Sequence, residues 1–226
     1  MNQTRRAVLL IGSPKRNNST SSALGDYLCA QMQERGFETQ SIHINTAMGS
    51  EESTKQMLAD VDSANVVILS FPLYVDSLPA ETTRCLETIA KHRANDNRTG
   101  TPRLLAIANS GFPEASQNNT ALDICRIFAR QAGFQWLGGL AMGGGGAMHG
   151  LPVEDAGGMA RHAKKALDMA AADIALDRPI SEGAINEITK PVVPSWLYRW
   201  IANRQWRKQA KEAQITGRLD DRPYEE

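Results

Sequence analysis

Residues 5–22 read RRAVLLIGSPKRNNSTSS, and this stretch decides the fold class. The apolar run Ala7–Ile11 has no polar alternation, which is typical of a strand buried on both faces of a sheet. Gly12–Pro14 ends the run, and residues 23–35 then carry apolar side chains at helical spacing before Gly36. A buried strand, a polar loop and a helix in this order form the opening unit of an α/β protein.

The same unit recurs along the first 178 residues. After the opening strand, further strands are expected at 37–44, 66–69, 104–108 and 134–142. Helices are expected at 23–35, 52–63, 79–91, 120–132 and 154–177. Strands that helices connect run parallel, with right-handed crossovers that cover both faces of the sheet. We therefore predict an α/β, doubly wound, five-stranded parallel sheet in a domain over residues 1–178, followed by a C-terminal helical extension over 179–226.

The composition excludes several classes of protein. The 226 residues include 25 basic and 25 acidic side chains, so the chain lacks the positive surplus of a nucleic-acid binder. No apolar run is long enough to cross a bilayer, and the run near the N-terminus is too short for the apolar part of a secretion signal. We therefore expect no nucleic-acid partner, no stable membrane insertion and a cytoplasmic location.

The cysteines indicate packing rather than chemistry. Cys29, Cys85 and Cys125 are odd in number and far apart, which argues against a disulfide framework and against a four-thiolate metal site. Each lies in a helix-like stretch beside apolar residues, so we expect all three in the core. No metal site is predicted.

The first candidate loop follows the opening strand and leads into a helix. A helix N-terminus offers unpaired N–H groups and the positive end of the helix dipole, so it favours a phosphate. The hydroxyl and basic side chains that would assist are Ser13, Lys15, Arg16, Ser19, Thr20 and Ser21. The alternative is a run that only caps the helix, because serine and threonine are good N-cap residues. The loop has neither a Walker A ending nor a G-x-G-x-x-G pattern.

Three later loops follow the third, fourth and fifth strands, whose carboxyl ends are the usual ligand-binding edge of such a sheet. Residues 70–80 read SFPLYVDSLPA and suit a flat aromatic ligand, or else pack under a neighbouring element or subunit. Residues 109–114 read NSGFPE and either turn backbone N–H groups toward a ligand or form an ordinary turn. Residues 143–150 read GGGGAMHG, where glycines allow close approach of a backbone or ligand. His149 is either a proton donor to a substrate or a surface histidine.

The extension combines aromatic and basic side chains between residues 195 and 213. Trp196 and Trp200 are four residues apart and share a helix face. Such a helix binds a membrane surface, packs on its parent domain or pairs with a dimer mate. We favour packing or dimerisation, which predicts a homodimer.

Together, the loops resemble those of the flavodoxin-like superfamily, and most of all its NAD(P)H-dependent FMN reductase and quinone reductase branch, which includes cluster-free relatives of the iron–sulfur flavoproteins. The segments that carry the resemblance are Gly12–Lys15, Ser19–Ser21, Pro72–Ala80 and Asn109–Glu114, within roughly residues 5–178. The resemblance implies the strand order 2-1-3-4-5 and a bound FMN. The chain departs from some relatives in lacking a compact cysteine cluster, and from acidic electron-carrier flavodoxins in being neutral.

The resemblance also implies which residues contact the cofactor. The FMN phosphate would contact Ser13, Lys15, Ser19, Thr20 and Ser21. The ring would lie against Pro72, Leu73, Tyr74, Val75 and Asp76. The other edge of the ring would be closed by Asn109, Ser110, Gly111 and Phe112.

The activity that the resemblance implies is that of an NAD(P)H oxidoreductase. NADPH or NADH would pass a hydride to the flavin N5 atom, and the electrons would then go to a small-molecule acceptor such as a quinone. No protein side chain is expected as a catalytic residue. The alternatives are an FMN-binding electron-transfer protein that does not oxidise nicotinamide, and a scaffold that does not bind FMN. Both nicotinamides, and acceptors from quinones to metal ions, fit the sequence.

Overall fold

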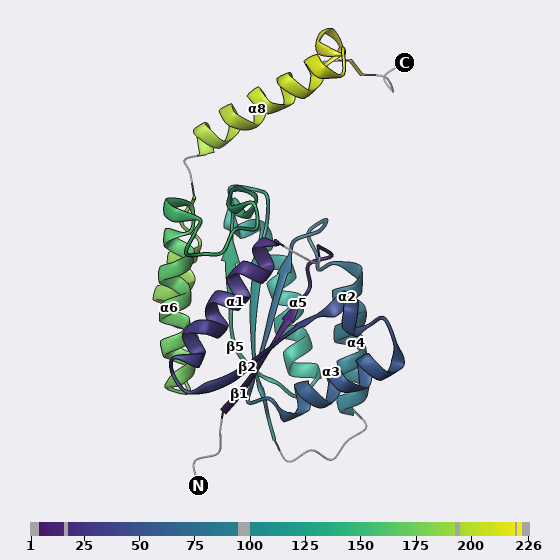
Figure 1. Ribbon diagram of the computed structural model, residues 1–226, viewed down its shortest axis with the longest axis vertical. Helices are drawn as coiled ribbons and strands as arrows, with labels where there is room; N and C mark the ends of the chain where they lie inside the picture. Colours follow the sequence, from purple (N-terminus) through teal and green to yellow (C-terminus); the bar gives the residue numbers. More distant parts are fainter. Residues whose placement is uncertain (1–4, 16–17, 95–99, 193–194, 220, 223–226) are drawn as a thin grey trace. The chain divides into compact units, whose positions relative to one another are not determined.

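The computed structural model describes residues 5–15, 18–94, 100–192, 195–219 and 221–222 (Figure 1). Its sheet has five parallel strands in the order β2-β1-β3-β4-β5, which confirms the predicted architecture. The strands are β1 (Arg5–Ile11), β2 (Phe37–His43), β3 (Val66–Pro72), β4 (Arg103–Asn109) and β5 (Gln135–Met142). The order reverses at β1, because the chain passes to β2 on one side and returns to β3 on the other.

Helices cover both faces of the sheet (Figure 1). One face carries α1 (Thr20–Gln33) and α6 (Arg161–Ala175). The opposite face carries α2 (Ile44–Ala47), α3 (Glu51–Ser63), α4 (Ala80–Ala94) and α5 (Asn119–Gln131).

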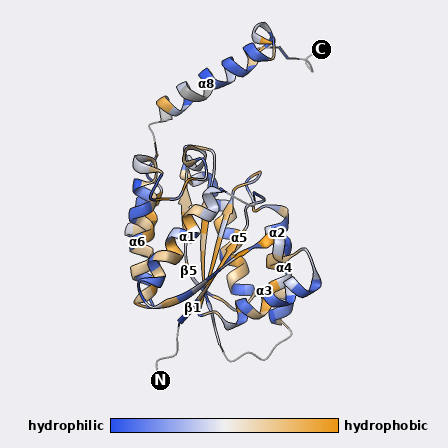
Figure 2. Cartoon of the chain, in the orientation of Figure 1, coloured by the Kyte–Doolittle hydropathy of each residue, from blue (hydrophilic) through white to orange (hydrophobic). Residues whose placement is uncertain are grey.

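Each face of the sheet encloses its own hydrophobic core, because successive side chains of a strand point to opposite faces. In β1, Leu9 belongs to the core that contains Leu28 of α1, whereas Leu10 belongs to the core that contains Leu86 of α4. The inner strands β1, β3 and β4 are accordingly apolar along most of their length, whereas the edge strand β2 is largely polar, and the helices have an apolar and a polar side (Figure 2). The prediction from residues 7–11 of a strand buried on both faces is confirmed.

The three cysteines are confirmed as core residues. Cys29, Cys85 and Cys125 are all buried and unbridged. Burial raises the pKa of each thiol to about 12, so none is present as a reactive thiolate near neutral pH.

Most element boundaries differ from the predicted ones by one to three residues. β3 continues to Pro72, so Ser70, Phe71 and Pro72 belong to the strand rather than to the loop. The helix expected from residue 154 begins at Arg161. Residues 157–159 form the 3-10 turn η3 instead, because glycine disfavours helix and Gly157 adopts a left-handed conformation with φ +55°.

The first compact unit extends to Val192, beyond the expected domain end at residue 178. Helix α7 (Glu182–Ile188) packs on α6 and β5, with Ala184 and Ile188 in the core. The Ile180 N–H donates to the Leu137 carbonyl at 2.8 Å, which ties the segment before α7 to β5. Residues 179–192 therefore belong to the α/β unit, and only the remainder forms a separate extension.

Residues 193–226 form a second compact unit. The structure describes in it α8 (Ser195–Glu212) and the 3-10 turn η4 (Thr216–Arg218). Among the helices built from described residues, none is long and apolar enough to cross a membrane.

Candidate functional site

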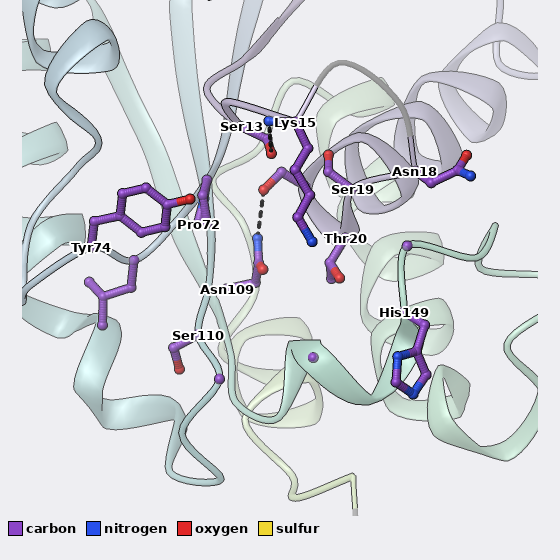
Figure 3. A pocket seen from close by; sticks show the side chains of 15 residues that line it. Ser13, Lys15, Asn18, Ser19, Thr20, Pro72, Tyr74, Asn109, Ser110 and His149 are labelled. Carbon is purple, nitrogen blue, oxygen red and sulfur yellow. Dashed lines mark hydrogen bonds between the residues drawn. The ribbon is translucent and has the colours of Figure 1, made fainter. Parts of the chain in front are cut away.

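A pocket of about 330 Å³ lies at the carboxyl ends of the strands, where the strand order reverses (Figure 3). Four loops that are far apart in the sequence contribute to it. Eleven of the fourteen predicted contact residues line it, and these are Ser13, Lys15, Ser19, Thr20, Ser21, Pro72, Leu73, Tyr74, Asn109, Ser110 and Gly111. Four further residues complete the lining, namely Asn18, Gly146, His149 and Gly150.

Three predicted contact residues do not line this pocket. Val75 and Asp76 form the tip of a tight hairpin, in which Tyr74 and Ser77 exchange two backbone hydrogen bonds of 2.9 and 3.0 Å. Both tip residues have positive φ, and Val75 is 97% exposed. Phe112 is 54% exposed and also lies outside the lining. Their contact with the ring therefore stays a prediction that the lining of this pocket does not support.

The N-terminus of α1 forms one end of the pocket. Ser19 is the N-cap: its Oγ accepts the Ser22 N–H at 3.0 Å and lies 2.7 Å from the Ser22 hydroxyl. The capping role proposed as the alternative is thus confirmed for Ser19. Within the described chain, the backbone N–H groups of Thr20 and Ser21 have no hydrogen-bond partner. These two donors lie at the positive end of the helix dipole and remain available to an anion.

The hydroxyl groups of this loop have structural partners. The Thr20 hydroxyl donates to the Gly145 carbonyl at 2.9 Å, so this side chain holds the glycine run at residues 143–146. The backbone N–H of Thr20 is then the group that remains available to a ligand. Ser21 Oγ accepts from Asn109 Nδ2 at 2.8 Å, and the Ser21 carbonyl accepts from the Ser70 hydroxyl at 2.7 Å. The start of α1 is therefore fixed to β3, β4 and the loop after β5.

Asn109 holds the centre of the site. Its side-chain amide donates to Ser21 Oγ and, at 3.0 Å, to the Phe71 carbonyl, while its own carbonyl accepts the Leu73 N–H at 2.8 Å. Figure 3 shows Asn109 between Thr20 on one side and Tyr74 on the other. Asn109 is therefore a strut between the loops as well as a lining residue.

Several backbone N–H groups of the second and third loops are engaged with the protein. Leu73 donates to Asn109, Tyr74 donates to Ser77, and Ser110 donates to the Met142 carbonyl at 3.0 Å. These three amides fix the loops, and hydrogen bonds from the second and third loops to a ligand edge stay a prediction. What Pro72, Leu73 and Tyr74 present to the pocket is mainly apolar and aromatic surface, and Tyr74 remains 48% exposed.

The glycine run brings three loops together. A side chain at Gly143 would collide with the Pro113 carbonyl, and one at Gly150 would collide with the backbone of Asn18. Gly144 and Gly145 donate to the carbonyls that follow β4, at 2.6 and 2.8 Å. The run is therefore a hydrogen-bonded contact surface. Glycines in this segment let neighbouring loops come close. This was the sequence signal that could have added Gly146 and Gly150 to the predicted site.

The electrostatics of the pocket favour an anion. No carboxylate occurs among the described lining residues, and Lys15 supplies a positive charge. His149, with φ +50°, is exposed at the pocket rim. Arg16, which the sequence indicated as a second cation, lies outside the described residues. Over the described part of the chain, no group of three metal-ligating side chains occurs.

No family model matches the sequence, and no curated protein matches it either. Solved structures do match the fold. An NAD(P)H:quinone oxidoreductase from Methanothermobacter marburgensis has a TM-score of 0.58 at 12% identity, over 76% of this chain and 96% of that one. An FMN-dependent NADH-azoreductase from Bacillus anthracis, solved with FMN, has a TM-score of 0.53 at 16% identity, over 76% and 99%.

Two further structures extend the comparison. An NADH:FMN oxidoreductase in its apo form has a TM-score of 0.53 at 18% identity, over 84% of this chain and 97% of that one. A flavodoxin from Streptococcus pneumonia has a TM-score of 0.52 at 14% identity, over 76% and 99%. At these identities the likeness concerns the fold. The chain has the flavodoxin-like fold, which it shares with NAD(P)H-dependent FMN reductases and quinone reductases.

Proposed function

We propose that this protein is an FMN-dependent NAD(P)H oxidoreductase that passes electrons to a small-molecule acceptor such as a quinone. The observation that carries the proposal is the contrast between the two ends of one pocket. One end combines the N-terminus of α1 with Lys15, and the other presents Pro72, Leu73 and Tyr74. A phosphate and a flat aromatic ring require these two kinds of surface. The shared fold of several flavin oxidoreductases supports the same reading.

The residues at the α1 end fit an FMN phosphate. The Thr20 and Ser21 N–H groups are unpaired among described residues, and no described carboxylate lines the pocket to repel the anion. Ser19 Oγ already accepts from the Ser22 N–H. When the Ser22 hydroxyl also donates to Ser19, the Ser19 hydroxyl proton is available to a phosphate oxygen. Lys15 adds charge, so the site would offer charge-assisted hydrogen bonds.

When bound, FMN supplies hydride acceptance at N5 and electron delivery to the next acceptor. The chain would bind and orient the cofactor. The amides of α1 would fix the phosphate, and Pro72 and Tyr74 would form the wall beside the ring. Asn109 would keep these two parts at a constant separation, because its amide joins Ser21 to the Phe71 carbonyl. No side chain of the protein is required to act as a nucleophile.

The identity of the nicotinamide, NADPH or NADH, stays a prediction, as do a cytoplasmic location and a homodimer. The similarity to a flavodoxin keeps a second candidate, an FMN-binding electron-transfer protein without its own nicotinamide oxidation. The two candidates share the cofactor site and differ in whether nicotinamide alone reduces the bound flavin.

The cofactor site is tested by titration of FMN and of riboflavin, which lacks the phosphate, with flavin fluorescence as the readout. Because hydrogen bonds to a charged group contribute about 1.5–3 kcal/mol each, we expect FMN to bind on the order of a hundredfold more tightly than riboflavin. Lys15→Gln should reduce this preference. Lys55→Gln, at an exposed position of α3 paired with Glu51, is the matched control. Equal binding of the two flavins would contradict the phosphate assignment.

A further inference from the structure

Helix α8 has an unusual distribution of side chains. Three of the four tryptophans in the chain, Trp196, Trp200 and Trp206, lie in this helix, and they are 66%, 55% and 67% exposed. Burying large aromatic side chains is strongly favourable, so three exposed tryptophans in one helix indicate a surface that has a binding partner.

The three tryptophans and four of the five basic residues share one side of the helix. At 3.6 residues per turn, the three tryptophans fall within an arc of about 120°. Arg199 and Arg207 fall inside this arc, and Arg204 and Lys211 fall beside Trp200 within about 40° of it. The Arg204 guanidinium lies 5.5 Å from the centre of the Trp200 ring, which is cation–π distance. The opposite side carries Gln205, Tyr198, Glu212 and Lys208, with Leu197 and Gln209 at its margins.

The helix is strongly basic although the whole chain is neutral. Residues 195–212 contain five basic side chains and the single acidic Glu212, which gives a formal net charge of +4. In the described structure, Glu212 lies 3.9 Å from Lys208 and is exposed, so little of the positive charge is neutralised. The partner surface must therefore be anionic as well as able to accept aromatic rings.

We propose that the Trp/Arg side of α8 binds the surface of an anionic lipid membrane. Indole rings favour the headgroup region, where their apolar body and polar N–H are both accommodated. Arginine pairs with phosphate through two parallel hydrogen bonds at the same depth. A mixed Trp/Arg face matches that layer, whereas the hydrophobic core of a protein would leave four cations buried without carboxylates. The helix would lie on the membrane and not span it, in agreement with its polar composition.

Other occupants fit this side of α8 less well. Pairing of α8 with α8 from a second copy, one of the arrangements that we favoured from the sequence, would bring two charges of +4 together, which is repulsive. Single-stranded nucleic acid is usually held in a positively charged groove, and one helix presents a convex surface. The proposal rests on α8 alone and does not depend on flavin binding.

The test is flotation of the full chain with vesicles of phosphatidylcholine alone and of phosphatidylcholine with phosphatidylglycerol. We expect binding to the anionic vesicles, with a blue shift of tryptophan emission, and much weaker binding to the neutral ones. At about 1 kcal/mol per basic residue near the surface, R204Q/R207Q should lower the partition coefficient about thirtyfold. W200A/W206A should lower it to a similar degree. Q205A/Q209A, on the opposite side of α8, is the matched control and should bind as the wild type does.

Circular dichroism of each variant checks that helix content is unchanged. Equal binding to neutral and anionic vesicles, or equal loss in Q205A/Q209A, would overturn the proposal. Binding to an oligonucleotide with none to vesicles, or a dimer that W200A/W206A dissociates with no vesicle binding, would assign the surface to another partner and overturn it too. FMN titration of the same variants should be unchanged, so failure here is separate from failure of the proposed flavin site.

Discussion

Replacement of Asn109 by alanine should destabilise the α/β unit and loosen the pocket together. The Asn109 side chain is 6% exposed and donates to Ser21 Oγ at 2.8 Å and to the Phe71 carbonyl at 3.0 Å. Alanine removes both bonds and leaves the Phe71 carbonyl, on a fully buried residue, without this donor. An unsatisfied buried polar group costs about 1–3 kcal/mol, and the second lost bond adds about 1 kcal/mol. We therefore expect a loss of about 2–4 kcal/mol.

The assay is thermal unfolding followed by circular dichroism. For a domain of this size, 1 kcal/mol corresponds to about 2–4 °C, so the midpoint should fall by about 4–16 °C. FMN affinity should fall as well, because Ser21 and the wall formed by Pro72 lose their common strut.

Two variants sharpen this test. Asn109→Asp keeps the shape of the side chain but replaces the donor by an acceptor that faces the Phe71 carbonyl, so it should be at least as destabilising as alanine. Asn186→Ala, at an exposed position of α7 whose side chain makes no hydrogen bond in the described structure, is the control and should shift the midpoint little. If Asn109→Ala behaves like Asn186→Ala, the assignment of Asn109 as a strut is refuted.

Three further outcomes are expected. Val75→Asn should raise the free energy of unfolding by about 1 kcal/mol, because asparagine tolerates the left-handed conformation that strains a β-branched residue. An unchanged melting midpoint would show that Val75 stores no strain. Thr20→Val should lower stability by about 1–2 kcal/mol yet leave FMN affinity within a few-fold of the wild type, because the Thr20 hydroxyl is bonded to the Gly145 carbonyl. A large loss of affinity would show that the hydroxyl contacts the phosphate instead. Hydrogen bonds from Lys190 and His162 lower the pKa of Glu187 from 4.5 to about 2. The contribution of Glu187 to stability is therefore complete above about pH 4.5 and is lost as the pH falls toward 2. Glu187→Gln should flatten the pH dependence of stability in that window, as chemical denaturation at several pH values would show.

The sheet was predictable because its strands carry their own signals. Residues 7–11, 66–69 and 104–108 are apolar without interruption, and such short runs between helices are typical of strands buried on both faces of a sheet. The position of the site could be predicted from the sheet, since the carboxyl ends of parallel strands meet at one edge and bring their loops together. Most of the predicted contact residues therefore line a single pocket.

The missed features depend on contacts between distant residues. Val75 and Asp76 are not typical of a tight hairpin turn, so the reversal that takes them out of the pocket lining has no local signal. The bond from Thr20 to Gly145 spans 125 residues, and no spacing rule reveals that this hydroxyl is already engaged. The α/β unit ends at Val192 and not at residue 178, because Ile180 packs over Gly138 of β5 and holds α7 against the sheet. This contact, too, joins distant residues.

We propose above that the pocket holds FMN and that nicotinamide alone reduces it. The most direct measurement is the visible spectrum of the protein after incubation with FMN and desalting, followed by anaerobic addition of NADH and, separately, of NADPH. We expect a retained flavin band that bleaches with at least one of the two nicotinamides. A retained band that neither nicotinamide bleaches would contradict the oxidoreductase and support an electron-transfer protein, and loss of the flavin on desalting, together with no FMN binding in the titration, would contradict the cofactor site itself.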